Sequence, residues 1–278
     1  MNTEELMAIA LEMAGLDEIP GDSAIHRSGD EIERILFGID LKAPELVIAS
    51  AQGYDCAISH HPVGGSSTLR FHEVLEQHVD QMIDAGVPRD VAEETMRATI
   101  EERRVLSSMT NYDHDPSVAA LLDIPYLNIH TPLDEIGRRR MAEAAAEAAA
   151  DATVAELVDR LYETFGELRN AATEIEVRVG KPENRLGRVV VSHGAGTNGG
   201  HPVAKAYFDH GIDTVIYIHC RPADAKKLNE EYGGAKNLIV TGHIASDSLG
   251  INPYVDRLRE EGLNVTTFSG IVPAERSV

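Results

Sequence analysis

The chain has 278 residues, which is long enough for one large α/β unit or two smaller lobes, and we favour two lobes. Its formal net charge of −21 repels phosphate backbones and anionic membrane surfaces at long range, so a nucleic-acid or lipid-surface function is disfavoured. The two cysteines, Cys56 and Cys220, are too few for a disulfide framework and lie in apolar runs, as expected in a reducing compartment.

The first 15 residues predict an amphipathic helix rather than a signal peptide. Apolar side chains recur at helical spacing, and the segment lacks a basic start. No apolar run approaches the ~20 residues needed to cross a bilayer, so we expect a cytoplasmic protein without a membrane role. Residues 21–30 indicate a polar turn.

A strand, a helix and a second strand follow as a βαβ unit, over residues 32–41, 42–53 and 55–59. The second strand runs straight into His60 and His61, and ligands of open α/β sheets collect at such carboxyl ends. Consecutive side chains on extended backbone point to opposite sides, so two neighbouring ions could each take one imidazole. The alternative is one exposed histidine and one hydrogen-bonded core histidine.

The middle of the chain is mainly helical. A loop at 64–68 leads into a segment, residues 74–104, whose apolar spacing predicts two helices that serve as a packing element or an oligomer contact. His72 and His78 are expected to be solvated there. A short helix and a strand at 125–129 come next, and the strand ends in a second polar motif, His130-Thr-Pro-Leu-Asp134.

The second half predicts two helices and then another run of strands and helices. The ranges are helices at 141–152 and 154–168, strands at 174–179 and 186–192, a helix at 202–210, a strand at 213–219, a strand at 237–240, a helix to 261 and a strand at 264–268. Gly211, Asp213, Ile216 and His219 match the spacing of Gly53, Asp55, Ile58 and His61, which indicates two related α/β halves.

A glycine-rich turn, His193-Gly-Ala-Gly-Thr-Asn-Gly-Gly200, opens the second βαβ unit. Exposed amides at a helix N-terminus favour anions, so the turn could hold a phosphate. It does not fit the dinucleotide spacing and lacks the lysine of a P-loop, so a plain tight turn is the preferred interpretation.

Three strand ends supply candidate metal ligands. His243 and Asp247 follow the strand at 237–240 and lie four residues apart, which places them on one face of a helix. The motifs after Ile58 and Ile129 supply the others. Mixed imidazole and carboxylate ligation suits Zn, Mn or Fe rather than Ca, and two such ions could activate water for attack on a carbonyl-like or amidine-like carbon.

Three ordered motifs resemble the metal-binding motifs of the Nif-three-like family, which includes the GTP cyclohydrolase 1 type 2 homologues: Ser59-His-His-Pro62, His130-Thr-Pro-Leu-Asp134 and Gly242-His-Ile-Ala-Ser-Asp247. Ile35-Leu-Phe-Gly-Ile-Asp40 and Gly194-Ala-Gly196 are also similar to segments of that family. The resemblance therefore covers nearly the whole chain.

The resemblance implies an α/β fold of two lobes, each with a mixed sheet flanked by helices. The first lobe would comprise residues 1–137 and 240–278, with 74–104 as a helical insert, and the second lobe would comprise 138–239. It also implies two divalent ions between the lobes, a toroidal homohexamer, and the ligands His60, His61, Asp134, His243 and Asp247, with His130 lining the site and one carboxylate bridging the ions.

Two departures from the family pattern matter. Asp247 stands where the family usually has Glu, and Tyr217-Ile-His219 stands where a Thr-Gly-Glu is common, which puts shared substrate chemistry in doubt. Met109-Thr-Asn-Tyr-Asp113 is a rival for the middle motif, but it lacks the leading histidine, so Asp134 is preferred.

The first functional hypothesis is a metal-dependent hydrolase that cleaves a C–N bond, such as that at the purine C8 of a nucleotide. The GTP assignment rests on the resemblance alone. His130, His193 and His219 are the candidate acid or base, because imidazole titrates near neutrality, although each could instead be structural. The alternative is a non-catalytic metal-binding ring that binds a partner, or that buffers or delivers metal.

Overall fold

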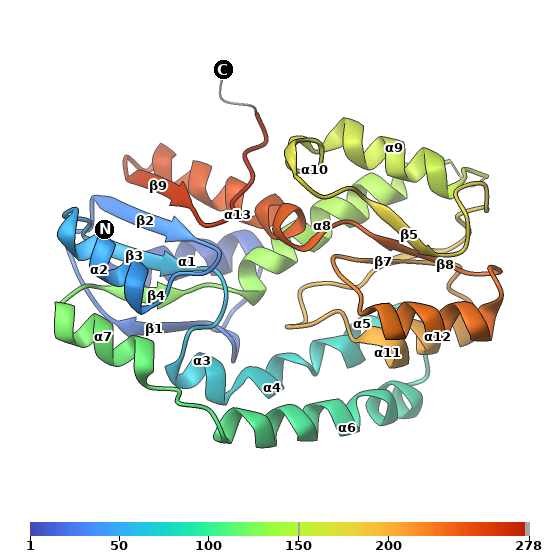
Figure 1. The fold of residues 1–278 in the computed structure, drawn as a ribbon, viewed down its shortest axis with the longest axis horizontal. Coiled ribbons are helices and arrows are strands. Elements are labelled where there is room, and N and C mark those ends of the chain that lie inside the picture. The colour runs from blue at the N-terminus through green and yellow to red at the C-terminus, as the bar shows by residue number, and fades with distance from the viewer. Residues whose placement is uncertain (150, 276–278) are drawn as a thin grey trace. The chain divides into compact units, whose positions relative to one another are not determined.

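The computed structural model describes residues 1–149 and 151–275, which form two compact units (Figure 1). Unit 1 consists of Met1–Val74, Ile100–Ile136 and Gly250–Ile271, and unit 2 of the described residues of Leu75–Thr99, Gly137–Leu249 and 272–275. Each unit contains one mixed sheet flanked by helices, which confirms the predicted fold class.

Unit 1 contains a five-stranded sheet in the order β1-β4-β3-β2-β9. Its strands are β1 (Ala24–Arg27), β2 (Arg34–Gly38), β3 (Cys56–Ser59), β4 (Tyr126–Asn128) and β9 (Asn264–Phe268). Strands β4, β3, β2 and β9 run parallel, and β1 pairs antiparallel with β4 at the edge. The carboxyl ends of β2, β3 and β4 and the start of β1 therefore share one edge of the sheet.

Helices cover both faces of this sheet. Ile35 and Phe37 of β2 face a core shared with α1 and α13, whereas Leu36 faces a second core shared with α2 and α7. This alternation follows from the two-residue period of a strand. The helices that contribute to unit 1 are α1 (Thr3–Ala14), α2 (Ala43–Ala51), α3 (Gly65–Leu69), α4 (Phe71–Val74) and α7 (His114–Leu122).

Three further helices contribute residues to both units: α6 (Arg89–Ser108), α8 (Thr131–Ala146) and α13 (His243–Glu260). None of the helices in the described part of the chain combines the length and apolar character needed to cross a membrane. The two cysteines form no disulfide; Cys56 is buried in the unit 1 core, where burial raises the pKa of its thiol, so it packs as a small apolar side chain.

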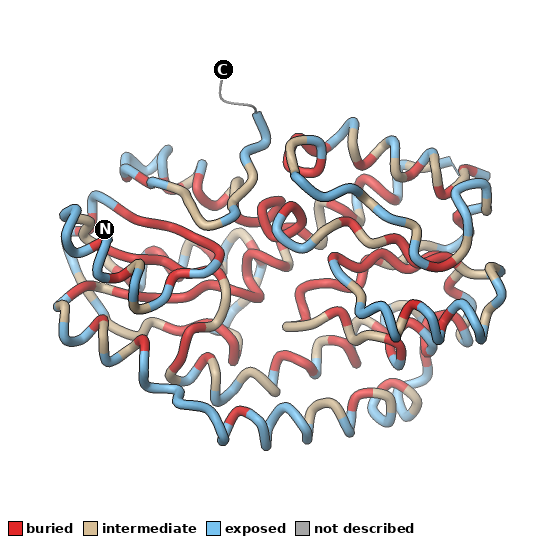
Figure 2. Tube along the Cα trace, in the orientation of Figure 1, coloured by how far each residue is buried: buried red, intermediate tan, exposed pale blue. Residues whose placement is uncertain are grey.

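Unit 2 contains a four-stranded sheet in the order β5-β8-β7-β6. Its strands are β5 (Glu176–Val179), β6 (Val189–Val191), β7 (Thr214–Tyr217) and β8 (Asn237–Val240), and its helices include α5 (Gln77–Asp84), α9 (Val154–Thr164), α10 (Gly166–Asn170), α11 (Gly200–Asp209) and α12 (Pro222–Tyr232). Buried strand residues form the centre of each unit (Figure 2).

The two sheets repeat one arrangement, as the sequence match predicted. In both, three parallel strands are followed by an antiparallel edge strand, so that β2, β3, β4 and β1 correspond to β6, β7, β8 and β5. Asp55 and Asp213 have the same structural role. Each carboxylate accepts a hydrogen bond from the backbone N–H of an arginine at the start of the neighbouring strand or just before it, at 2.7 Å from Arg34 and 3.0 Å from Arg188.

Several local predictions were wrong. Residues 24–27 form β1 rather than a turn, and residues 65–69 form α3 rather than a loop. An edge strand of four residues with one neighbour leaves little hydrophobic pattern to detect. The helix predicted at 141–152 begins at Thr131, directly after β4, and ends at Ala146; Ala150 lies outside the described residues. Helix α12 was not predicted.

The prediction that His78 is solvated was also wrong. Its side chain on α5 is fully buried, and its Nε2 lies 3.1 Å from the Thr197 hydroxyl of the glycine-rich turn. Burial lowers the pKa of His78 to about 4, because the charged imidazole would lose its hydration. His78 is therefore neutral at pH 7 and packs α5 against the turn.

This burial predicts a pH dependence of stability. In the unfolded chain the pKa of His78 is about 6.5, so between pH 6.5 and 4 the unfolded state binds more protons than the folded state. The free energy of unfolding should therefore fall as pH falls through this window, by on the order of 3 kcal/mol. Urea unfolding measured between pH 6.5 and 4 should show that this decrease is absent in His78→Gln and present in His114→Gln, a control at an exposed site. Equal slopes in all three proteins would contradict the assignment.

Candidate metal centre

One edge of the unit 1 sheet gathers polar side chains. Asp40 follows β2, His60 and His61 follow β3, and His130 follows β4. Asp22 precedes β1, whose start lies at the same edge because β1 runs antiparallel to β4. The parallel pairing of β2, β3 and β4 thus converts residues that are far apart in the sequence into neighbours.

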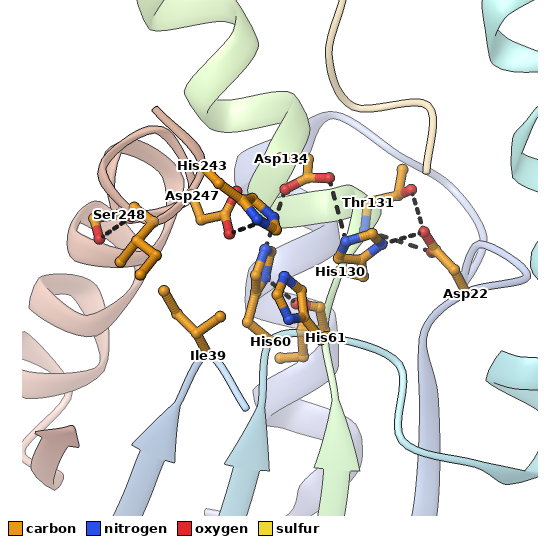
Figure 3. Close-up of polar contacts among 12 residues, drawn as sticks. Asp22, Ile39, His60, His61, His130, Thr131, Asp134, His243, Asp247 and Ser248 are labelled. Carbon is orange, nitrogen blue, oxygen red and sulfur yellow. Dashed lines mark hydrogen bonds and ion pairs between the residues drawn. The ribbon is translucent and has the colours of Figure 1, made fainter. Parts of the chain in front are cut away.

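Three imidazoles converge at this edge (Figure 3). One ring nitrogen from each of His60, His61 and His130 lies within 4.8 Å of the other two. The ring centroids are 5.2 Å apart for His60 and His61, 4.9 Å for His60 and His130, and 5.7 Å for His61 and His130. These three side chains could hold a metal ion.

Oxygen atoms orient each imidazole through its Nδ1. The Nδ1 of His60 lies 3.0 Å from the Ile129 carbonyl oxygen, that of His61 lies 3.0 Å from Asp40 Oδ1, and that of His130 lies 2.7 Å from Asp22 Oδ2. A carbonyl or carboxylate oxygen can only accept, so each Nδ1 carries the hydrogen and donates. Each Nε2 then carries no hydrogen, which is the usual tautomer of metal-binding histidines.

Asp134 places a carboxylate among these Nε2 atoms. Its Oδ1 lies 3.2 Å from Nε2 of His60, and its Oδ2 lies 3.6 Å from Nε2 of His130. Asp134 is in the first turn of α8, where the helix dipole favours a negative charge, and it is 4% exposed. The rival Asp113 is exposed just before α7.

Unit 2 carries a second His-x-x-x-Asp pair at the corresponding place, after β8. Nε2 of His243 lies 3.3 Å from Oδ2 of the buried Asp247, which confirms that the two share one face of α13 (Figure 3). The preceding Gly242 has φ 98° and lies so close to Thr173 that a Cβ would be 2.8 Å from its hydroxyl. Only glycine fits this tight connection between strand and helix.

His219, at the end of β7, lies beside the His243 ring, with the centroids 4.8 Å apart. Its side chain is exposed, and its backbone is fixed by Asn198, whose Oδ1 accepts hydrogen bonds from the N–H groups of Ile218 and His219 at 2.6 and 3.3 Å. His193 lies in the glycine-rich turn of the same unit and is only 2% exposed. Its carbonyl oxygen accepts a hydrogen bond from the Gln81 amide at 2.6 Å.

The structure corrects one expectation and adds two residues. His60 and His61 were expected to point to opposite sides, but their rings are neighbours because β3 ends at Ser59 and the alternation of a strand no longer applies. Sequence reasoning missed Asp22 and Asp40. Asp40 ends a predicted strand and could have been found by its position, whereas Asp22 lies in a segment whose pairing only the fold reveals.

The donor set fits a divalent transition metal. Imidazole nitrogens and carboxylate oxygens together suit Zn, Mn or Fe, and the Nδ1 contacts supply the supporting hydrogen bonds that such sites require. The fold and these clusters define a two-unit α/β protein with histidine and aspartate groups that could bind metal.

Comparison with known proteins agrees with this class. The model of the Duf34/NIF3 family, described as NGG1p interacting factor 3, matches residues 24–272, so the chain belongs to this family. This confirms the predicted Nif-three-like membership. No curated protein matches the sequence.

Solved structures share the fold over almost the full length. A NIF3 superfamily protein from Sphaerobacter thermophilus is 47% identical, with a TM-score of 0.93 over 97% of this chain and 98% of that chain. Reduced HcgD from Methanocaldococcus jannaschii is 15% identical, with a TM-score of 0.56 over 96% and 97%. A hypothetical protein from Staphylococcus aureus is 13% identical, with a TM-score of 0.54 over 100% and 99%. The last two similarities show the fold alone.

The buried Asp22 generates a prediction about metal affinity. Asp22→Asn removes the negative charge beside the imidazole and keeps only one acceptor oxygen, so that the side chain can no longer accept from both Nδ1 of His130 and the backbone N–H of Thr131. Because such supporting hydrogen bonds are worth about 10–100-fold in affinity, Zn²⁺ binding measured by competition with a chelator should weaken by that factor. The exposed control Asp17→Asn should bind as the unaltered protein does. Unchanged affinity in a folded Asp22→Asn protein would show that Asp22 does not orient a ligand.

Proposed function

We propose that this protein is a metal-dependent hydrolase with a dinuclear centre. The observation that carries the proposal is the convergence of His60, His61 and His130, each oriented by an oxygen at Nδ1 so that Nε2 can ligate. A purely structural histidine needs a hydrogen bond, but it does not need the ring nitrogens of two other histidines nearby. Three such imidazoles beside a buried carboxylate are characteristic of a metal site.

The proposed ligands are His60, His61, Asp134, His243 and Asp247, together with His130, for which the resemblance implied only a place in the lining of the centre. Asp134 suits a bridging role, because its two oxygens face different imidazoles. The unit 1 cluster and the His243–Asp247 pair are each short of the ligands that two ions require, so we propose that they serve one centre. The ions would be Zn, Mn or Fe.

Bound divalent ions would act as Lewis acids and lower the pKa of nearby water, which is the chemistry that hydrolysis needs. The chain's own residues would orient and move protons around them. Asp22 and Asp40 hold the hydrogens on Nδ1 of His130 and His61. His219 is the favoured acid or base, because it is exposed beside His243, whereas His193 is buried.

The proposed reaction is hydrolysis of a C–N bond in a small molecule such as a nucleotide, of the GTP cyclohydrolase type 2 kind. The three sequence motifs support this assignment. The proposed assembly is a homohexamer, which the same motifs support. Exposed apolar side chains on two helices packed together in unit 1, Val47 and Ile48 of α2 and Leu121 of α7, suit a contact between copies.

A shared centre predicts non-additive losses of metal. Elemental analysis of the unaltered protein should give two ions per chain, and His61→Ala and Asp247→Ala should each reduce this content. If both residues serve one centre, the double variant should lose little more metal than the single variant that loses more, because contributions to one site do not add. His114→Ala and Asp256→Ala, two exposed sites with Asp256 on the same helix as Asp247, should retain full content. Additive losses would indicate two separate sites.

The catalytic proposal predicts turnover. Protein loaded with Mn, Fe or Zn should release formate from GTP, and His61→Ala should reduce the rate at least 100-fold, since the centre supplies the activated water. His114→Ala is the matched control. If the metal-loaded protein is inert across a panel of nucleotides and cyclic amides, the alternative of a non-catalytic metal-binding ring protein, an interaction or regulatory scaffold, takes precedence.

A further inference from the structure

A pocket of about 230 Å³ lies beside the imidazole cluster of unit 1. Its lining residues are Pro62, Thr68, Phe71, Arg103, Leu106, Ser107 and Thr110. Pro62 directly follows His61, and the Phe71 ring lies 6.2 Å from the His130 ring at an interplanar angle of 33°. A molecule in this pocket would therefore reach two of the histidines of the candidate metal centre.

Arg103 distinguishes this pocket from an ordinary surface hollow. The other arginines of α6 pair with carboxylates: Arg89 with Glu93, Arg97 with Glu94 and Arg104 with Glu101. Arg103 forms no ion pair with any of residues 1–149 and 151–275. Its guanidinium instead lies over the Phe71 ring, 5.0 Å from the centroid. In a chain with a net charge of −21, an arginine left without a carboxylate is available for another anion.

The contact with Phe71 uses none of the hydrogen-bond donors of Arg103. A guanidinium beside an aromatic ring keeps its N–H groups, which can bind a carboxylate or phosphate with two hydrogen bonds. Phe71 and Leu106 supply apolar surface, and Thr68, Ser107 and Thr110 supply hydroxyl groups. This is the mixture typical of a small-molecule site: an apolar wall with a few polar groups.

We propose that this pocket binds the planar aromatic part of an anionic substrate, with Arg103 on its anionic group and Phe71 against its ring. The inference rests on the proposed function and names the substrate class of that centre: a heteroaromatic anion. The volume is below the roughly 300–1,000 Å³ of pockets for drug-sized ligands, so one ring system fits and a larger ligand extends outside.

Binding of matched probes to the chelator-treated, metal-free full chain tests this proposal. The probes are nicotinate, its neutral analogue nicotinamide, and the saturated anion cyclohexanecarboxylate, each titrated by ligand-observed NMR. Nicotinate should bind at least tenfold more tightly than either analogue. Arg103→Gln should weaken nicotinate at least tenfold and abolish its advantage over nicotinamide, and Phe71→Leu should abolish its advantage over cyclohexanecarboxylate. Arg103→Lys should fall in between, because it keeps the charge but loses the planar fork.

Arg104→Gln is the matched control, since Arg104 is the next residue on α6 and pairs with Glu101; its affinity for nicotinate should stay within twofold. Thermal unfolding of each variant establishes that it is folded. Equal binding of the three probes, or an Arg103→Gln protein that binds nicotinate normally, would overturn the proposal. Metal content measured on the same variants separates the pocket hypothesis from the metal-centre hypothesis. If the protein binds two ions per chain but does not distinguish the probes, the pocket alone is refuted. If it distinguishes the probes but binds no metal, the metal centre alone is refuted.

Discussion

Three hydrogen bonds at Nδ1 determine what the histidine cluster can do. The Ile129 carbonyl, Asp40 and Asp22 each hold one imidazole in the tautomer whose Nε2 carries no hydrogen. Two of the three acceptors are carboxylates, which strengthen the donor properties of the ring toward a cation. Without these oxygens the rings could rotate, and the grouping of three ring nitrogens within 4.8 Å of one another would be lost.

The repeated architecture explains how such a site arises. Both units place a parallel strand before a helix, and both carry a His-x-x-x-Asp pair there: His130 and Asp134 in unit 1, and His243 and Asp247 in unit 2. A helix that begins shortly after a buried strand puts residues four apart on one face, and in unit 1 the carboxylate of Asp134 also lies in the first turn, where the helix dipole favours a negative charge. Unit 1 differs by carrying two adjacent histidines, His60 and His61, after its central strand, where unit 2 has the single His219 after β7.

The segment around α6 connects this site to substrate choice. The helix carries many charges. Its arginines Arg89, Arg97 and Arg104 pair with carboxylates, whereas Arg103 borders the pocket beside His61 and His130. An overall negative charge slows the approach of anions at long range, whereas a single oriented guanidinium acts at short range. The proposed selectivity is therefore local and depends on contact rather than on steering.

Sequence analysis alone was enough to predict the α/β class, most of the strands and helices, the family, the ligand candidates His60, His61, Asp134, His243 and Asp247, and His130 as a residue that lines the site. It could do so because hydrophobic periodicity is local and the motifs are contiguous. It did not reveal β1, the early start of α8, or the burial of His78, which depend on neighbours distant in the chain. Only the tertiary structure showed that Asp22 supports His130 and that Arg103 lies over Phe71, because hydrogen bonds and stacking between residues about 108 and 32 positions apart leave no pattern in a linear sequence.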